Sequence, residues 1–184
     1  PNTTYDGYVG IEPSKCSRRD LVSDLYDALH PRDIELLVYL PSGAPAADPV
    51  AVERLEWEWG FPGDWPESWG PERRGERLAA FQTKWEAIIR EWSTRWGPKI
   101  RGWWIDGCYF TDHIHRPESP HLKRLAQAMR AGNSESIVAF NPGVKNPVIS
   151  VTDSEDYTAG EIAGDFPITN YEWKPGGPIE GSVG

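Results

Sequence analysis

The stretch Gly102–Phe110 reads GWWIDGCYF and places one acid, Asp106, directly after the most apolar run in the chain. A short apolar run of this kind is typical of a strand that is buried on both faces of a parallel sheet. A buried carboxylate is costly unless it is paired, protonated or hydrogen-bonded, so a chain that tolerates one usually gains a function from it. The stretch therefore predicts a buried strand over 100–105 with a functional acid at its carboxyl end.

Strands and helices are expected to alternate on both sides of this strand. Further strands are expected at 34–40 (IELLVYL), 136–140, 148–151 and 167–173. Helices are expected at 18–30, where Ser17-Arg18-Arg19-Asp20 has the form of a capping box, at 74–96, and from 119 to the Gly132-Asn133 pair. This alternation predicts an α/β fold with a parallel sheet. An open doubly wound sheet and a (β/α)₈ barrel both satisfy the order. Since a full barrel takes roughly 250 residues, the chain would hold about half of one, the central strands and helices.

A long Trp-, Pro- and Gly-rich insertion is expected at 41–74, with a short helix at 49–57. It contains four of the ten tryptophans of the chain, Trp57, Trp59, Trp65 and Trp69. These rings either pack the insertion or wall a binding cleft, and packing is the favoured interpretation. The 184 residues suit a single domain, taken here as one segment of a catalytic domain over 1–184.

Composition excludes several classes of partner. The net charge is −9 and the pI is about 4.9, and the 19 basic residues are interspersed with 28 acids, so a nucleic-acid partner is not expected. No apolar run reaches the ~20 residues of a membrane span, and no signal peptide is visible. The start at Pro1 suggests processing or truncation. Cys16 and Cys108 are expected as two buried thiols rather than a disulfide. The oligomeric state stays open.

Acids and aromatic residues follow the predicted strands at their carboxyl ends, where (β/α) proteins gather functional side chains. They are Tyr39, then Trp104, Asp106 and Tyr109, then Asn141, then the segment 154–161 (SEDYTAGE), and finally Tyr171, Glu172 and Trp173. Two carboxylates beside aromatic faces are what glycoside hydrolysis requires, one to attack or to activate water and one to protonate the leaving oxygen. This rim therefore predicts a glycosidase.

Four motifs in order resemble glycoside hydrolase family 29, the retaining α-L-fucosidases. GWWIDG is similar to the family's strand-end motif in which Trp-x-Asp supplies the nucleophile. RRDLVSDLYDAL before IELLVYLPSG, AFNPGV, and DYTAGE resemble its neighbouring helix and strands and its acid/base segment, and NYEWKPG also has a counterpart. One departure concerns Asn141-Pro142-Gly143, which stands where the family often carries Asn-Asp-Arg. The early strands, with their His-rich sugar sites, have no counterpart in this chain.

The resemblance implies a (β/α)₈ barrel that removes a terminal deoxy-sugar by double displacement. Asp106 would be the nucleophile and Glu161 the acid/base. The sugar would contact Trp104, Tyr39, Tyr109, Asn141, Tyr157 and Trp173. No metal or organic cofactor is implied, and a secreted, periplasmic or lysosomal location follows from the same resemblance.

Three alternatives stay open at this point. The chain is either such an enzyme or a carbohydrate-binding module that kept the barrel and lost turnover. A metal-dependent hydrolase is a third interpretation, because Asp112, His113 and His115 follow Asp106 at a spacing that metals use. Glu172 is a second candidate for the acid/base.

Overall fold

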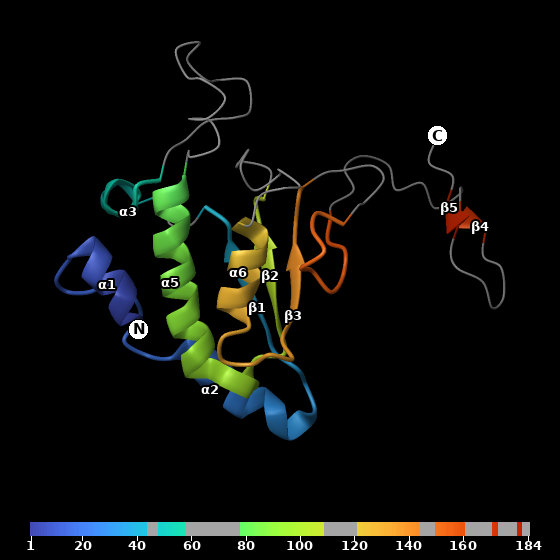
Figure 1. Ribbon diagram of the computed structural model, residues 1–184. Coiled ribbons are helices and arrows are strands. Elements are labelled where there is room, and N and C mark those ends of the chain that lie inside the picture. The colour runs from blue at the N-terminus through green and yellow to red at the C-terminus, as the bar shows by residue number, and fades with distance from the viewer. Residues whose placement is uncertain are drawn as a thin grey trace, which may run out of the picture.

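The computed structural model describes residues 1–43, 48–57, 78–108, 121–143 and 150–160, and the backbone of 171–172 and 180–181. Three parallel strands form the centre of this part of the chain (Figure 1). They are β1 (Leu37–Pro41), β2 (Gly102–Asp106) and β3 (Ile137–Phe140), paired in the order β1-β2-β3. Tyr39 lies beside Trp104, and Trp104 beside Ala139. The predicted α/β class and the parallel sheet are confirmed.

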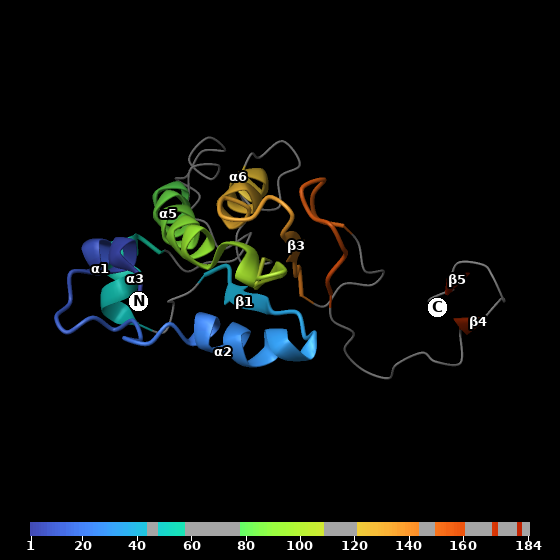
Figure 2. The same ribbon diagram turned by 90° about the horizontal axis from the view of Figure 1, so that it is seen from below.

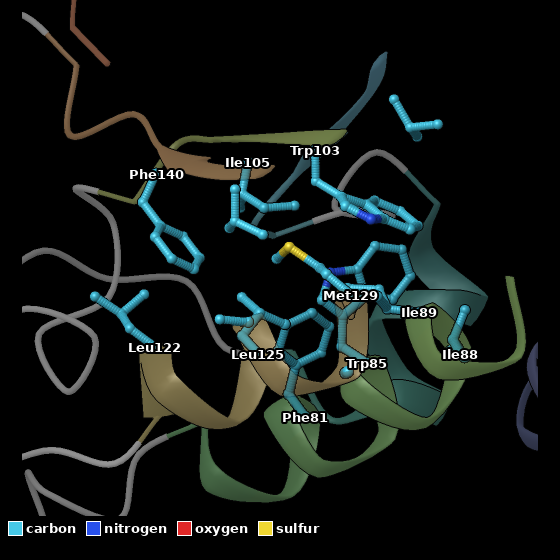
Figure 3. Close-up of a cluster of buried hydrophobic side chains, with 14 of the residues drawn as sticks. Phe81, Trp85, Ile88, Ile89, Trp103, Ile105, Leu122, Leu125, Met129 and Phe140 are labelled. Carbon is cyan, nitrogen blue, oxygen red and sulfur yellow. The ribbon is translucent and has the colours of Figure 1, made fainter. Parts of the chain in front are cut away.

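Two helices cover one face of this sheet, α5 (Ala79–Trp96) and α6 (His121–Met129), and Figure 2 shows them together on that side. Successive side chains of a strand point to opposite faces, so β2 sends Trp103 and Ile105 toward the helices. Figure 3 shows this core, in which both side chains are fully buried against Phe140 of β3 and against apolar side chains of the helices, namely Phe81, Trp85, Ile88, Ile89, Leu122, Leu125 and Met129. Trp104 and Asp106 belong to the other face.

The predicted apolar stripe along α5 is confirmed, and its tryptophans continue into the sheet. Trp92 stacks on Trp96 with ring centroids 5.8 Å apart, and Trp96 lies 5.9 Å from Trp103 of β2. The described part of the helix begins at Ala79, after Leu78 in the left-handed conformation, and positions 74–77 of the expected helix lie outside the described residues. Packing of large flat rings fixes the rotation of α5 against β2.

An N-terminal helix that the sequence analysis missed, α1 (Thr3–Val9), packs against α5. Its N-cap Asn2 is fully buried and donates from Nδ2 to the Ile88 carbonyl at 2.9 Å. The Glu91 carboxylate accepts hydrogen bonds from the Thr3 and Thr4 backbone N–H groups at 2.8 and 2.7 Å. An acidic side chain at a helix N-terminus satisfies donors that the helix itself leaves unpaired.

The remaining elements are short. They are α2 (Leu21–Leu29), η1 (His30–Arg32), α3 (Pro49–Leu55), η2 (Gly97–Lys99) and an antiparallel pair, β4 (Tyr171–Glu172) and β5 (Glu180–Gly181). The short helix expected in the 41–74 insertion is α3. Trp57, which follows it, is buried with its ring centroid 4.8 Å from that of Phe81, as the packing interpretation requires. Trp59, Trp65 and Trp69 lie outside the described residues.

The strand expected at 34–40 is wrong in its start and in its burial. β1 begins at Leu37, and Leu37 and Tyr39 are 43% and 59% exposed. Only alternate residues of the run point into the core, so an unbroken apolar run does not establish burial on both faces. The capping box at Ser17 is also wrong, because Asp20 caps α2 by accepting from the Ser23 N–H at 3.2 Å.

The strand expected at 148–151 is not formed in its described half, Ser150 and Val151. Side chains of the following segment occupy the edge of β3 instead. Asp156 Oδ2 accepts from the Val138 N–H at 2.7 Å, and Glu155 Oε2 accepts from the Phe140 N–H at 3.3 Å. These carboxylates take backbone donors that another strand would have used. The described residues contain no helix of the length and apolarity that a membrane span requires.

Replacing Glu91 with Gln should destabilise the protein at neutral pH by about 2 kcal/mol. Burial alone would raise the pKa of Glu91, but the N–H and hydroxyl groups of Thr3 and Thr4 lower it from 4.5 to about 2. A lowered pKa contributes stability above pH 4.5 and loses it as the pH falls toward 2. Urea unfolding should therefore show that the free energy of unfolding changes less between pH 7 and pH 3 for Glu91→Gln than for the native chain. Glu53→Gln, at an exposed position of α3, should leave the difference unchanged.

Gly102→Ala should lower the free energy of unfolding by about 2 kcal/mol or more. A Cβ at Gly102 would meet the Ile137 carbonyl oxygen at 2.6 Å, which neighbouring strands cannot relieve without moving apart. Gly7→Ala is the matched control, because nothing lies within 4 Å of its added Cβ and α1 gains helix propensity. Thermal unfolding that ranks Gly102→Ala at or above Gly7→Ala would contradict this close strand contact.

Candidate active site

The carboxyl ends of the three strands are tied together around Asp106, the last residue of β2. The Ser42 N–H donates to the Asp106 carbonyl at 2.6 Å, and its hydroxyl donates to the Gly107 carbonyl at 2.8 Å. On the other flank the Asn141 N–H donates to the Ile105 carbonyl at 2.7 Å. The backbone that carries Asp106 is therefore fixed from both neighbouring strands.

The Asp106 carboxylate accepts one side-chain hydrogen bond on each oxygen. Its Oδ2 accepts from the Tyr39 hydroxyl at 2.5 Å, and its Oδ1 accepts from Asn141 Nδ2 at 2.7 Å. Tyr39 comes from β1, and Asn141 directly follows β3. Both donors are neutral, so they orient the carboxylate without neutralising its charge. Among the described residues Asp106 is half-buried, and alternation along β2 places it on the sheet face opposite α5 and α6.

An aromatic pair includes Trp104, a neighbour of Asp106 on β2. Trp104 precedes Asp106 by two residues and shares its face of β2. Its ring lies 6.3 Å from that of Tyr157, between centroids, at an interplanar angle of 51°. Burial, together with the charge of Asp156, raises the pKa of the Tyr157 hydroxyl, so Tyr157 stays a neutral donor at physiological pH. A flat apolar surface beside a carboxylate suits a sugar ring.

Cys108 follows Asp106 by two residues and belongs to the buried core. Its side chain is fully buried, and its N–H donates to the Asn141 carbonyl at 3.1 Å. Burial, with the charges of Asp106 and Glu155, raises the pKa of the thiol far above its ordinary value. The thiol is therefore packing rather than a nucleophile. Cys16 is also a free thiol, so the expected absence of a disulfide between the two is confirmed, but Cys16 is only partly buried and the expectation of two buried thiols is wrong for it.

The structure brings three of the predicted site residues into hydrogen-bond contact, Asp106, Tyr39 and Asn141, and it places the ring of Trp104 beside that of Tyr157. Glu161, Tyr109 and Trp173 lie outside the described residues, as do Asp112, His113 and His115. For Glu172 only the backbone is described, in β4. No cluster of three metal-ligating side chains occurs in the described part of the chain.

Sequence analysis missed Ser42, although Ser42 follows β1 where the rule for functional side chains applies. The signal was its position directly after Pro41, at the carboxyl end of the strand. Its hydroxyl and N–H both bond the β2 end, and it is 3% exposed. Ser42 therefore fixes the backbone at the end of β2 and is too buried to contact a ligand.

Two cavities lie away from this carboxylate. One, of about 520 Å³, is at the amino ends of β2 and β3, lined by Arg101, Arg130, Ser136, Asp153 and their neighbours. The other, of about 280 Å³, is largely apolar and lies between α2, β1 and α5, where Leu21, Leu40, Trp92 and Trp96 line it. Tyr39 borders the second cavity, so it is the link between that cavity and Asp106.

The fold is similar to that of solved endo-fucoidan hydrolases from glycoside hydrolase family 107. For MfFcnA4 the TM-score is 0.55 at 20% sequence identity, over 79% of this chain and 24% of that enzyme. A variant of MfFcnA4 gives 0.61 at 19% identity, over 90% and 29%. MfFcnA9 gives 0.60 at 18% identity, over 85% and 33%. The chain thus spans about a quarter to a third of the length of these enzymes. No protein-family model and no curated protein matches the sequence.

The assignment to family 29 is wrong, because the similar structures belong to family 107 and no family model supports the fucosidase motifs. Short motifs such as Trp-x-Asp mark the carboxyl end of a strand. That position carries functional residues throughout (β/α) folds. Motifs of this length therefore located the strand end correctly and identified the family incorrectly.

In the folded protein, iodoacetamide at pH 8 should modify Cys16 slowly and Cys108 not measurably. Burial raises the pKa of both thiols, but Cys16 is partly exposed whereas Cys108 is fully enclosed. Peptide mass spectrometry checks this, and unfolding in guanidinium chloride should make both thiols react. Modification of native Cys108 at the rate of Cys16 would contradict the full burial of Cys108 beside the end of β2.

Proposed function

We propose that the protein is a glycoside hydrolase acting on fucose-containing polysaccharides, with Asp106 as the catalytic nucleophile of a retaining mechanism. The observation that carries this proposal is the Asp106 carboxylate, held by Tyr39 and Asn141 at the carboxyl end of the central strand. A carboxylate oriented by neutral donors keeps its charge for attack at an anomeric carbon. Trp104 and Tyr157 supply aromatic surface for the sugar and Tyr39 also borders it, whereas Asn141 is buried and acts through Asp106.

The described strands and helices are proposed to form part of a (β/α)₈ barrel. Parallel strands with α5 and α6 on one face match such a barrel, in which helices lie outside and functional residues stand at the carboxyl ends. The tied strand ends around Asp106 would then face the mouth of the barrel. We treat 1–184 as one segment of the catalytic domain, with the insertion at 41–74 as one of the loops at that mouth.

The substrate class comes from the similar structures, which are endo-fucoidan hydrolases. An enzyme of this kind cleaves within a chain, so sugars extend on both sides of the cleaved bond. For this protein we infer a fucose-containing polysaccharide rather than a single terminal sugar as the natural substrate. The similarity in fold and the half-buried carboxylate at the carboxyl end of the central strand support this class together.

Glu161 is proposed as the acid/base, which would protonate the departing oxygen and then activate water. It follows the segment that carries Tyr157 by four residues along the chain. In a retaining pair the two carboxyl groups stand about 5–5.5 Å apart across the cleaved bond. Tyr109 and Trp173 complete the proposed set of sugar contacts.

A 2-deoxy-2-fluoro-fucosyl fluoride should label the protein on Asp106, and peptide mass spectrometry should locate the adduct there. Fluorine at C2 slows both steps, so the glycosyl-enzyme ester accumulates when the leaving fluoride favours its formation. Asp106→Ala should lower the rate of fucan-oligosaccharide hydrolysis by about 10³-fold or more. Glu161→Ala should lower the rate of hydrolysis strongly for oligosaccharides. The loss of rate should be smaller for an aryl fucoside, because a good leaving group departs without a proton from Glu161.

Asp153→Asn is the matched control, because Asp153 is an exposed acid at the opposite end of the sheet. This variant should keep full labelling and full hydrolysis. Binding of fucan oligosaccharides without any labelling or turnover would favour the non-catalytic carbohydrate-binding module. Loss of hydrolysis in EDTA would instead favour the metal-dependent mechanism through Asp112, His113 and His115.

A further inference from the structure

The two oxygens of the Asp106 carboxylate lie in different surroundings. Oδ1 accepts from Asn141, which is 1% exposed, and therefore points toward the protein interior. Oδ2 accepts from Tyr39, which is 59% exposed, and therefore points toward the accessible side. A carboxylate oxygen has two lone pairs, so Oδ2 can accept from the phenol and still approach an electrophile.

Asn141 is fixed by hydrogen bonds of both its backbone and its side chain. Its Oδ1 accepts from the Gly143 N–H at 3.0 Å, in a turn where Gly143 adopts a φ of 79°. Its backbone N–H and carbonyl bond Ile105 and Cys108. Because both its backbone and its amide are fixed, Asn141 can restrain the rotation of the Asp106 carboxylate during a reaction.

Tyr39 has the opposite character, since more than half of it is exposed and its hydroxyl reaches Asp106 from the neighbouring strand. In register Tyr39 pairs with Trp104, so its ring lies two residues below the carboxylate and its hydroxyl spans the remaining distance. An exposed phenol contributes little to folding, so its removal tests the hydrogen bond rather than the fold.

We propose that Asn141 and Tyr39 are positioning residues with different functions, Asn141 fixing Oδ1 as the carbonyl oxygen and Tyr39 assisting Oδ2 as the attacking and departing oxygen. This inference rests on the proposed retaining mechanism. It assigns which oxygen of Asp106 forms the bond to the sugar, and it separates the effects of the two donors on the two chemical steps.

In the first step Oδ2 forms a bond to the anomeric carbon while the bond to the leaving oxygen breaks and the acid/base gives that oxygen its proton. The negative charge of the carboxylate disappears, so the hydrogen bond from Tyr39 weakens as the ester forms. In the second step water attacks the same carbon, its proton goes to the acid/base, and Oδ2 departs with the electron pair. Tyr39 then stabilises the charge that returns to Oδ2.

The two variants therefore should differ in which step they slow. Tyr39→Phe should slow release of the 2-fluorofucosyl adduct about tenfold or more and change its formation less than about threefold, because only release develops charge on Oδ2. Asn141→Ala should slow formation and release by similar factors, because Oδ1 needs the same orientation in both steps.

The experiment measures the rate of adduct formation and, after removal of excess reagent, the rate of reactivation, both by intact-mass spectrometry. Tyr8→Phe is the control for the phenol and Asn133→Ala for the amide. Asn133 uses its amide in a similar way, with Oδ1 accepting from the Glu135 N–H, at the opposite end of the sheet. Both controls should react and reactivate at native rates. Circular dichroism and thermal unfolding establish that each variant is folded.

Equal slowing of both steps by Tyr39→Phe, or no change in either, would overturn the assignment of Oδ2. If Asn141→Ala fails to fold, Tyr39→Phe still decides the question, since its side chain is largely exposed. A native protein that forms no adduct on Asp106 at all would contradict the proposed function, which is a different result from an adduct whose release ignores Tyr39.

Discussion

Successive side chains of β2 alternate between the two faces of the sheet, and this alternation determines both the core and the candidate site. Trp103 and Ile105 are fully buried against α5 and α6, whereas Trp104 and Asp106, one residue on, face the other way. A slip of one residue would bury the carboxylate beneath two helices and expose two of the largest core side chains. The energy that holds the core together therefore also determines where the carboxylate points.

The protein satisfies its costly carboxylates in two distinct ways. Glu86 on α5 is nearly buried, and its cost is offset by Arg124 of α6 at 2.8 Å and by the Gln82 amide at 3.1 Å. Burial nevertheless raises the pKa of Glu86. Asp106 receives a phenol and an amide instead of a cation. A guanidinium beside a carboxylate lowers its nucleophilicity as it stabilises its charge, so neutral donors are the arrangement that suits attack on a sugar.

How far the sequence predicted the structure depended on the kind of signal. Strand ends were located well: Asp106 and Asn141 stand at the carboxyl ends of β2 and β3, because apolar runs that fill a core leave a clear boundary. Burial of β1 was not predicted well, since IELLVYL is apolar at positions that face away from the helices. The short α1 was missed because its position depends on contacts that are distant along the chain, from Asn2 to Ile88 and from Thr3 to Glu91, 86 and 88 residues apart.

The sequence also predicted the candidate site only in part, because contacts between residues far apart in the chain cannot be read from a motif. A strand-end rule names the residues that share an edge of the sheet, but it does not say which of them touch. Tyr39 and Asn141 were expected to contact sugar, and the structure shows that each donates first to Asp106. Tyr39 is exposed enough to contact a ligand as well, whereas Asn141 is 1% exposed and reaches the site through the carboxylate.

The positions of Tyr39 and Asn141 on opposite flanks of β2 follow from the strand order β1-β2-β3, which requires the crossover helices α5 and α6 to return each strand beside its neighbour. The chemistry of the acid therefore depends on topology as much as on the motif that contains it.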